Sequence, residues 1–336
     1  MRTIIKGIAY HLPAKVLTNK ELGAQHPDWK MGLIESKTGV RERHIAAQDE
    51  TSLDLALAAC LKLFGENLGL EDNIDGVLFC TQTPDFRLPG NACLLQEKLK
   101  LPMSTLALDL NVACSGYLYG LGVAEGFLSK GRVKNLLLVT AETYSKCINP
   151  GDRSAQVLFG DGAAVTWLTA SDTAKGVVDL QLGSHGAAHD KFYIPGGGCR
   201  QPFRDGMDEV VVDQSANARS LTDIHMDGPA VFMFVSSVIP RNIKALLKKN
   251  SLTTDDIDYY VFHQGSLMTL DALTRGLKLD ERKVANSLSD KGNTVSASIP
   301  IALREAMDAG RLKDGEKVLL CGFGAGISWG TALVQF

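Results

Sequence analysis

An internal duplication constrains the fold of this chain more than any other sequence feature. Leu70–Thr83 reads LEDNIDGVLFCTQT, and Leu252–Gly265 reads LTTDDIDYYVFHQG. Both segments place an Ile-Asp pair before an apolar run, and the two pairs begin at Ile74 and Ile257. A self-similarity at this separation, about half the length of the chain, is typical of a duplicated structural unit whose copies pack on each other.

Two further pairs of segments repeat this relation. Gly131-Arg132 and Gly310-Arg311 each follow an expected helix and precede an expected strand, at nearly the same separation as the Ile-Asp pairs. Phe159–Gly162 (FGDG) and Phe323–Gly326 (FGAG) lie near the ends of the two copies. We therefore expect two pseudo-symmetric halves, residues 1–175 and residues 176–336, in one compact body.

Strands and helices alternate when apolar runs and helical spacings are followed along the chain. Strands are expected at Ile4–Tyr10, Ile74–Cys80, Leu106–Leu110, Asn135–Thr140, Ala163–Leu168, Tyr259–Phe262, Lys317–Cys321 and Thr331–Gln335. Helices are expected at Asn19–Trp29 after the N-cap Thr18, Ser52–Phe64, Asn91–Leu99, Ser115–Lys130, Val231–Leu247, Leu267–Leu277 and Ile299–Ala309. The alternation predicts an α/β fold with largely buried sheets.

Two segments do not fit this alternation. Ser184–Asp223 is long and irregular, and a loop of that length in a compact protein is usually functional. We expect it, together with Phe86–Gly90, to line a substrate pocket. Thr38–Arg43 is expected to be a charged turn, and its charges fit a solvated loop as well as a ligand-facing one.

Cys114 lies in the segment around which the first half is organised. Asp109–Gly116 reads DLNVACSG, between an expected strand and an expected helix. A thiol at the start of a helix meets the positive end of the helix dipole and free backbone N–H groups, and both favour the thiolate. A single unpaired cysteine is nevertheless more typical of a protein core, so its assignment as a nucleophile depends on its partners.

The duplication gives Cys114 two partners. Asn293 follows Cys114 by the same number of residues as Gly310 follows Gly131, and it also precedes an expected helix. His263 follows Cys80 by the same number of residues as Ile257 follows Ile74, and it ends the matching strand. Strand ends and helix starts are where α/β folds place ligands, so we expect Cys114, His263 and Asn293 to converge. A lone histidine or asparagine is more often structural, but together the three suit acyl transfer from a thioester. Backbone N–H groups at Cys114 and in Gly324–Gly326 could form a second oxyanion site.

Composition and missing motifs narrow the classes of function. A net charge of −3 gives no general attraction to nucleic acid or to anionic membranes. The seven cysteines are scattered without zinc-ligand spacing, which predicts reduced thiols, a cytoplasmic location and no metal. The N-terminus lacks signal-peptide features and no apolar run reaches membrane-spanning length, so no membrane association is expected. Phosphate-loop, zinc-protease, serine-hydrolase and dinucleotide motifs are absent.

With these residues identified, the chain resembles the thiolase superfamily and, within it, the β-ketoacyl-acyl carrier protein synthase III family. The resemblance covers essentially the whole chain. Its motifs are Thr38–Arg43, Asn111–Gly116, Phe159–Ala163, Phe262–Gln264, Gly292–Thr294 with Ala297–Pro300, and Gly322–Phe336. It implies a layered α-β-α-β-α body, a homodimer, and no metal or bound cofactor.

The resemblance also implies a reaction and its residues. Cys114 would be acylated by an acyl-CoA, and malonyl-acyl carrier protein, presented on its phosphopantetheine arm, would then lose carbon dioxide and attack the acyl-enzyme. His263 and Asn293 would stabilise the thioester enolate, and the backbone of Cys114 and Ala325 would form the oxyanion site. Substrate contacts are implied for Arg153, Lys37, Leu33, Ser266 and Phe323. From the residues alone, Arg153 fits a solvated loop charge equally well.

Three positions depart from the family pattern. Leu33 replaces a tryptophan that stacks on the CoA adenine. Met268 replaces an arginine on the helix that docks the carrier protein, although Lys37 keeps another expected cation. Gly265-Ser266 replaces Ala-Asn beside the pantetheine arm. The chemistry is therefore expected to be intact and substrate recognition to be altered.

Two other classes of function remain open at this point. One is an acyltransferase of a dedicated secondary-metabolite or special-lipid pathway that moves the acyl group to a non-malonyl acceptor, which release of carbon dioxide would distinguish. The other is a non-catalytic partner subunit, which would normally have lost one of Cys114, His263 or Asn293; all three are present.

Overall fold

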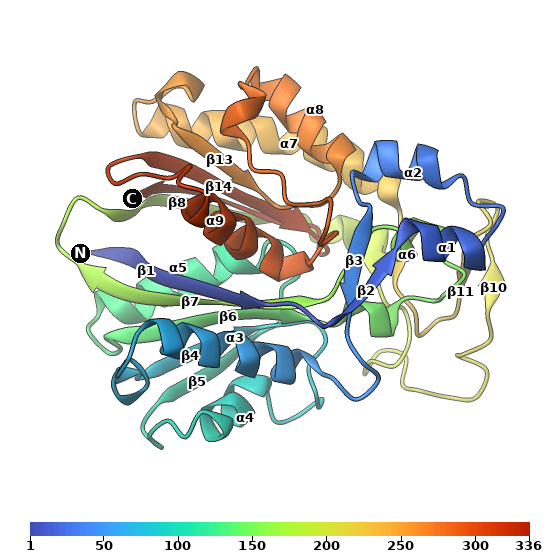
Figure 1. Cartoon of the computed structure of the whole chain (residues 1–336), viewed down its shortest axis with the longest axis horizontal. Helices are drawn as coiled ribbons and strands as arrows, with labels where there is room; N and C mark the ends of the chain where they lie inside the picture. The colour runs from blue at the N-terminus through green and yellow to red at the C-terminus, as the bar shows by residue number, and fades with distance from the viewer.

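The computed structural model describes residues 1–336, and its principal strands form two sheets that run side by side (Figure 1). The first sheet has the order β1-β7-β6-β4-β5 and the second β13-β14-β15-β8. Their bounds are β1 Arg2–His11, β4 Gly76–Cys80, β5 Leu106–Leu110, β6 Asn135–Glu142, β7 Gly162–Ser171, β8 Gly176–Ser184, β13 Tyr259–Phe262, β14 Lys317–Gly324 and β15 Ser328–Gln335. The first sheet therefore takes all its strands from the first half of the chain and the second sheet from the second half.

The two sheets repeat one pairing scheme. β4 pairs parallel with β6, which pairs antiparallel with β7, which pairs antiparallel with β1. β13, β14, β15 and β8 pair in the same sequence with the same directions. β5 has no full counterpart, because only an isolated bridge between Tyr260 and Val284 lies in the equivalent place beside β13.

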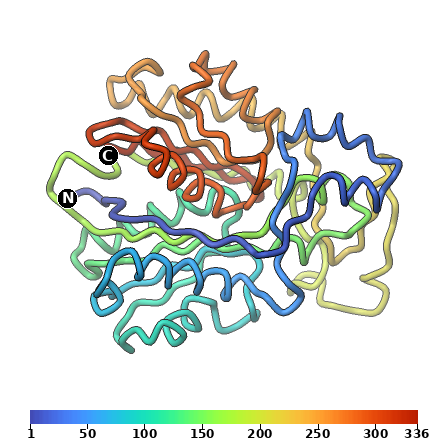
Figure 2. The backbone as a smooth tube through the Cα atoms, viewed as in Figure 1, coloured from blue at the N-terminus to red at the C-terminus, as the bar shows by residue number.

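Helices complete the layers. Their bounds are α1 Asn19–Gln25, α2 Met31–Thr38, α3 Ser52–Glu66, α4 Asn91–Lys98, α5 Gly116–Ser129, α6 Arg153–Gln156, α7 Gly228–Lys249, α8 Leu267–Leu277 and α9 Ser298–Asp308. α3 and α4 cover the outer face of the first sheet, α7 and α8 cover the outer face of the second, and α5 and α9 lie between the sheets (Figures 1 and 2). The expected α-β-α-β-α arrangement is confirmed.

Apolar residues on both faces of the central strands account for this layering. Every residue of β4 is buried, as is every residue of β13, so each strand needs a helix layer on both sides. Leu78 and Leu138 of the first sheet and Val261 and Leu320 of the second pack in one core with α5 and α9. A sandwich of two sheets around two helices therefore buries both copies of the duplicated unit.

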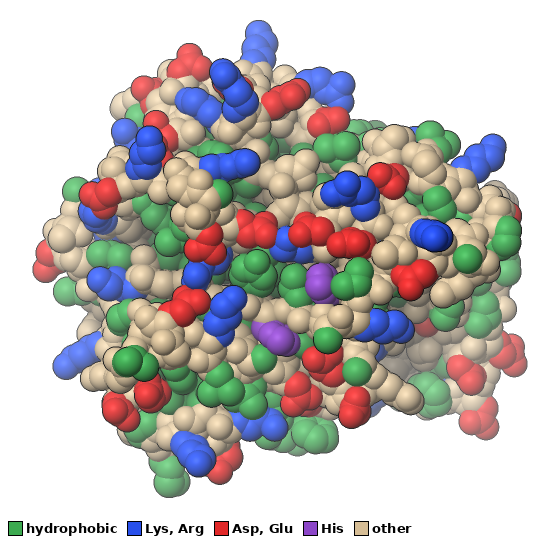
Figure 3. Space-filling model, viewed as in Figure 1, with side chains coloured by type: hydrophobic (Ala, Val, Ile, Leu, Met, Phe, Trp, Pro, Cys, Tyr) green, Lys and Arg blue, Asp and Glu red, His purple; other side chains and the backbone are tan.

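The short elements lie mainly at one end of the sandwich. They comprise β2 Lys15–Thr18, β3 Glu42–Ile45, β9 Phe192–Tyr193, β10 Val211–Val212, β11 Ala218–Arg219, β12 His225–Met226, and the 3₁₀ turns at 71–73, 144–147, 186–191, 254–256, 281–283 and 295–297. Figure 1 shows β2, β3, β10 and β11 at the end to which α1, α2 and α6 also belong. Over the viewed face, acidic and basic side chains lie side by side (Figure 3).

Most expected elements are confirmed, and the differences have local causes. The Thr18 cap is confirmed, since its hydroxyl accepts from the Glu21 N–H at 3.2 Å. β5 was expected to be buried but is only half-buried, because it forms the edge of its sheet. α2 and β8 were not expected: α2 has no fully buried residue, and β8 alternates polar and apolar positions.

The expected charged turn Thr38–Arg43 proves to be largely structural. It consists of the end of α2, Gly39 with a left-handed φ of 74°, and the start of β3. Arg43 is fully buried and donates to Asn19 Oδ1 and the Val157 carbonyl, both at 2.8 Å. Burial lowers the pKa of Arg43 to about 10. Arg43 thus joins β3 to the segment after α6 and contacts neither solvent nor a ligand cavity.

The expectation that no apolar run reaches membrane-spanning length also needs correction. α7 has 22 residues and is long and apolar enough to cross a membrane by length and composition alone. Its buried face, which includes Val235, Ile239 and Ile243, packs in the core of the second sheet. Arg241 and Lys244 lie exposed on the same helix, so α7 has the pattern of a helix that covers a sheet.

Candidate active site

Cys114, His263 and Asn293 line a single cavity of about 420 Å³, which we call the reaction cavity. Cys114 comes from the first half of the chain, and His263 and Asn293 come from the second. The rest of its wall is mostly apolar: Leu158, Phe159, Phe192, Met226, Gly228, Pro229, Val231, Phe232, Val235, Gly265, Ser266, Met268, Thr269, Phe323 and Gly324. The structure therefore brings together three side chains that are far apart in the sequence.

Close backbone packing holds Cys114 at the turn between β5 and α5. A Cβ atom added to Gly324 would lie 2.9 Å from the Cys114 sulfur, and one added to Gly116 would lie 2.3 Å from the Cys80 sulfur. Both positions therefore require glycine. The Cys114 side chain is only 2% exposed, and the reaction cavity is the space that it lines.

Burial dominates the ionisation of Cys114. It raises the pKa of the thiol far above its ordinary value of 9.0, and the nearby charge of Glu142 raises it further, while a backbone N–H hydrogen bond opposes these effects only in part. The sequence-based expectation of a thiolate is therefore wrong for the unliganded site. A helix dipole contributes less to a thiol pKa than removal of the sulfur from water.

His263 lies at the carboxyl end of β13. Its backbone N–H donates to the Cys321 carbonyl at 2.7 Å, and its ring packs edge-on against Phe323 at 5.5 Å between centroids. Burial lowers the pKa of His263 to about 3. The imidazole is therefore neutral at physiological pH.

Ser298, which the sequence reasoning did not single out, fixes the His263 ring. The Ser298 hydroxyl lies 2.7 Å from Nδ1 of His263 and accepts from the Gln264 N–H at 3.3 Å. A Ser298 hydroxyl that accepts from the Gln264 N–H is free to donate its hydrogen to Nδ1. We therefore assign the ring hydrogen to Nε2, beside Gly265 in the wall of the reaction cavity.

Asn293 is held by backbone contacts on both sides. Its N–H donates to the Leu158 carbonyl at 2.8 Å, and its carbonyl accepts from the Gly160 N–H at 3.0 Å. Its side-chain oxygen accepts from the Val295 N–H at 2.9 Å, which orients the amide nitrogen away from that contact. Asn293 and His263 therefore offer N–H donors to the same cavity.

The duplication predicted the neighbourhood of Asn293 but not the residue-level match. α5 begins at Gly116 and α9 at Ser298, and this spacing is slightly longer than the spacing of the Gly-Arg pairs. The structural equivalent of Cys114 is then Ser296, which follows Asn293 within one turn of chain. The 3₁₀ turn Val295–Ala297 before α9 accounts for the difference.

The other expected substrate residues divide between two cavities. Ser266 and Phe323 line the reaction cavity, where Ser266 also caps α8 through Thr269. Arg153, Lys37 and Leu33 line a separate cavity of about 490 Å³, at the end of the molecule formed by α1, α2 and α6. Val157 lines this outer cavity and the next two residues, Leu158 and Phe159, line the reaction cavity. The two cavities are thus neighbours along one stretch of chain.

Ala325 lies beside the reaction cavity rather than in its wall. Gly324 lines the reaction cavity, whereas Ala325 lines an adjoining cavity of about 580 Å³. The Ala325 carbonyl accepts from the Ser328 hydroxyl at 2.9 Å. No group of three or more His, Cys, Asp or Glu side chains suitable for a metal ion is present.

Glu142 is a buried acid near the thiol that sequence reasoning missed. Its carboxylate accepts from the Gln82 N–H at 3.0 Å, the Thr83 hydroxyl at 3.1 Å and the Ser296 hydroxyl at 3.1 Å. Burial raises the pKa of Glu142 to about 8 in spite of these bonds. Glu142 therefore links the loop after β4 to the turn before α9, across the two halves.

Comparison with known proteins identifies the family. The model of 3-oxoacyl-[acyl-carrier-protein] synthase III matches residues 108–186, and the model of its C-terminal part matches residues 247–336. The chain is 35% identical to β-ketoacyl-[acyl-carrier-protein] synthase III of Sulfurovum sp. (strain NBC37-1) over 334 residues, covering 98% of this chain and 95% of that protein. The chain belongs to the β-ketoacyl-[acyl-carrier-protein] synthase III family.

Other relatives agree with this family. The synthase III of Symbiobacterium thermophilum is 36% identical over 332 residues, covering 99% of this chain and 97% of that protein. A crystal structure of a 3-oxoacyl-(acyl-carrier-protein) synthase III has a TM-score of 0.97 at 39% identity, with both chains fully covered. The thiolase-like fold, the condensing activity of fatty acid biosynthesis and the acyltransferase class that the sequence predicted are confirmed.

Proposed function

We propose that this synthase III works by two half-reactions at Cys114. In the first, an acyl-CoA transfers its acyl group to the Cys114 sulfur. In the second, malonyl-acyl carrier protein loses carbon dioxide, and its carbanion attacks the acyl-enzyme to give a β-ketoacyl thioester. The observation that carries this proposal is that a thiol and two N–H donors from different halves line one cavity.

The donors define the roles that we assign to His263 and Asn293. Decarboxylation of a malonyl thioester places negative charge on the thioester oxygen, and fixed N–H donors stabilise that charge. A neutral His263 with its hydrogen on Nε2 is such a donor, and the Asn293 amide is a second. Neither role requires a proton transfer from a charged imidazole.

The backbone N–H groups of Cys114 and Ala325 are the second oxyanion site in this proposal. Cys114 precedes the start of α5, where backbone N–H groups lack helical partners. Gly324 lies against the Cys114 sulfur, so the backbone that leads to Ala325 passes close to the acylated thiol. A carbonyl oxygen bound there would become the tetrahedral oxyanion in both half-reactions.

Substrate recognition is assigned to the two neighbouring cavities. Arg153 and Lys37 would contact the nucleotide phosphates of CoA in the outer cavity, where Leu33 offers an apolar surface to the base. Ser266 and Phe323 would contact the pantetheine arm in the reaction cavity. Met268 at its rim is 44% exposed, so a docked carrier protein would meet an apolar side chain there.

We further propose that the protein is a cytoplasmic homodimer. Each subunit would consist of two halves, residues 1–175 and residues 176–336. β5 pairs with β4 on one side only and leaves its other edge free. A free edge strand that carries exposed Leu108 is a template for pairing with a second copy. The small net charge of −3 gives no reason to expect nucleic acid or a membrane as partner.

A two-stage assay tests the proposed reaction. The purified protein is incubated with a panel of acyl-CoA thioesters, and intact mass spectrometry measures acylation of Cys114. Malonyl-acyl carrier protein is then added, and carbon dioxide and β-ketoacyl product are measured. Cys114→Ala should abolish acylation, whereas His263→Ala should impair condensation more than acylation. Acyl transfer to another acceptor without carbon dioxide would favour the non-malonyl alternative, and no label with any donor would reject both.

A further inference from the structure

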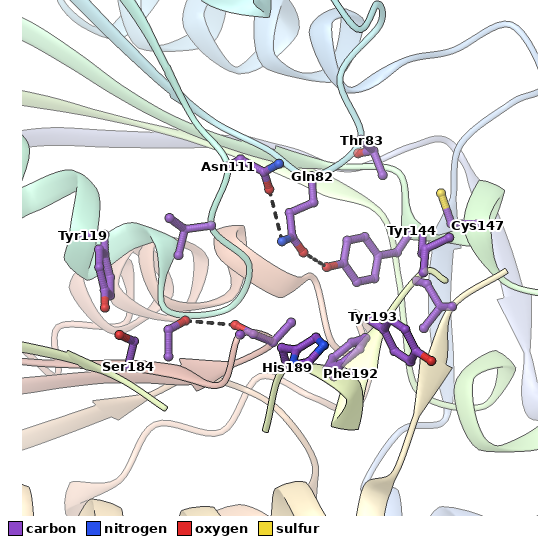
Figure 4. A pocket seen from close by; sticks show the side chains of 16 residues that line it. Gln82, Thr83, Asn111, Tyr119, Tyr144, Cys147, Ser184, His189, Phe192 and Tyr193 are labelled. Atoms are coloured by element: carbon purple, nitrogen blue, oxygen red, sulfur yellow. Dashed lines mark hydrogen bonds between the residues drawn. The ribbon is translucent and has the colours of Figure 1, made fainter. Parts of the chain in front are cut away.

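A second cavity, which we call the distal cavity, adjoins the reaction cavity near the Cys114 turn. Figure 4 shows the side chains that line it. Its volume is about 580 Å³. Val112 and Ala325 line it, and Phe192 lines both cavities. Gly324, next to Ala325, lies so near Cys114 that an added Cβ would be 2.9 Å from its sulfur. The distal cavity therefore offers space beside the Cys114 turn for the acyl chain of a thioester that binds in the reaction cavity.

One wall of the distal cavity carries a fixed chain of hydrogen bonds. The Tyr144 hydroxyl donates to Oε1 of Gln82, and Nε2 of Gln82 donates to Oδ1 of Asn111 at 3.2 Å. The backbone of Gln82 is itself anchored, since its N–H donates to Glu142. Figure 4 shows the Gln82 amide between Asn111 and the Tyr144 hydroxyl, and the Tyr144 ring packs edge-on against Phe192 at 6.4 Å between centroids.

These bonds leave one hydrogen-bond donor and one acceptor available to a ligand. Nε2 of Gln82 has two hydrogens and uses one for Asn111, and the Tyr144 oxygen has an unused lone pair. Tyr144 is buried, whereas Gln82 is half-buried and Asn111 is exposed, so a bound acyl chain would itself remove water from the open N–H of Gln82. An aliphatic chain packed here would leave the open donor without a partner, which costs binding free energy.

The distal cavity also lacks formal charges. Its lining contains no Lys, Arg, Asp or Glu, and His189 is its one histidine. A carboxylate or an ammonium group in the acyl chain would therefore be desolvated without a counter-charge. A neutral oxygen, which accepts from Gln82 or exchanges hydrogen bonds with Tyr144, meets no such penalty.

We propose that the acyl group taken up by Cys114 carries a neutral keto or hydroxyl oxygen along its chain, and that Gln82 and Tyr144 select it. This inference rests on the proposed acylation of Cys114. In that step a bond forms between the Cys114 sulfur and the acyl carbon, the bond from that carbon to the CoA sulfur breaks, and the thiol proton ends on the released CoA.

Matched acyl donors test the selection. Acylation rates of the full-length protein are measured by mass spectrometry with pentanoyl-CoA against 4-oxopentanoyl-CoA, and with hexanoyl-CoA against 5-oxohexanoyl-CoA. We expect the oxo compound of at least one pair to acylate Cys114 about tenfold faster, because its competitor covers the open N–H of Gln82 without pairing it. Gln82→Leu should remove most of that preference, and Tyr144→Phe should reduce it.

Controls separate selection from damage to the fold. Gln48→Leu makes the same chemical change at an exposed site that lines none of these cavities, and should keep the wild-type preference. If Gln82→Leu does not fold, the test uses the Tyr144→Phe variant and the wild-type ratio of the acylation rates for the oxo and the unsubstituted acyl-CoA. Equal rates within both pairs would overturn the inference while leaving acylation of Cys114 in place, whereas absence of label with every donor would reject the proposed function itself.

Discussion

Burial decides the charge state of the residues around the reaction cavity. It raises the pKa of Cys114 and of Glu142 and lowers the pKa of His263, so each group is pushed toward its neutral form. In the proposed reaction, a site that is neutral at rest would not repel the negative charge on the thioester oxygen. The N–H donors of His263 and Asn293 would then act without competition from a resident anion.

Ser298 provides a test of the His263 tautomer at the residue scale. Ser298→Ala should lower the condensation rate about tenfold, since one hydrogen bond that orients the donor is lost, and should affect acylation less. Ser298→Thr keeps the hydroxyl and should restore most of the rate. ¹⁵N NMR of labelled histidine should show the Nε2–H form in the wild type and a mixture in Ser298→Ala. An Nδ1–H form in the wild type would contradict the assignment.

Glu142 predicts a dependence of stability on pH. Its folded-state pKa of about 8 lies above the ordinary value of 4.5, so between these values the folded protein holds a proton that the unfolded chain has lost. The free energy of unfolding should therefore fall as pH rises from 5 to 8, by up to about 1.4 kcal/mol per pH unit from this group. Urea unfolding of Glu142→Gln should show a shallower fall. Glu97→Gln, at an exposed position on α4, should follow the wild type.

At the scale of elements, α5, which follows the Cys114 turn, packs closely between the two sheets. Its residues Leu118 and Leu121 lie in the core shared by both sheets. Gly330 of β15 allows the contact, because a Cβ atom there would lie 2.5 Å from Cβ of Leu118. Cβ of Leu118 cannot move without the helix, so this is a constraint on the backbone rather than on a rotamer.

Gly330→Ala should therefore destabilise the protein by about 1–3 kcal/mol through overpacking between β15 and α5. Gly65→Ala is the matched control: Gly65 lies in α3 with no other atom within 4 Å of an added Cβ. It should stabilise the protein by up to about 1 kcal/mol through helix propensity. Urea unfolding measures the change in the free energy of unfolding for both variants. Equal changes would show that the contact between Gly330 and Leu118 has room for a methyl group.

At the scale of the whole molecule, the duplication places Cys114, His263 and Asn293 from the two halves in one cavity and leaves one sheet edge free. Glu142 of the first half and Ser296 of the second are hydrogen-bonded at 3.1 Å, so the halves are connected near the thiol. β5 has no counterpart in the second sheet, and this asymmetry supplies the edge that we assign to the dimer.

The dimer proposal predicts a response to charge on that edge. Leu108 of β5 is 39% exposed, and Leu108→Lys should shift the protein toward monomer because lysine opposes edge-to-edge pairing. Sedimentation velocity at micromolar concentration measures the change. A wild type that sediments as a monomer, or a Leu108→Lys variant that stays dimeric, would remove β5 from the interface.

Local sequence patterns predicted most of the elements and the candidate nucleophile. Apolar runs at β4, β6 and β13 and helical spacing at α3 and α5 are properties of contiguous residues, so they are visible before folding. The duplicated Ile-Asp segments also predicted the layered α/β body. They placed His263 at a strand end and Asn293 before a helix, although the 3₁₀ turn before α9 shifts the exact correspondence from Asn293 to Ser296.

The tertiary structure decided what depends on distant neighbours. Arg43 is buried and connects separate segments only because Asn19 and the Val157 carbonyl, from elsewhere in the chain, accept its hydrogen bonds. The hydrogen on Nε2 of His263 follows from Ser298, and the polar wall of the distal cavity follows from Gln82 and Tyr144 meeting across two loops. The sequence by itself determined the fold and the candidate site residues, because these follow from local pattern and duplication. Protonation states and substrate selection were decided only by burial and by contacts between segments far apart in the chain.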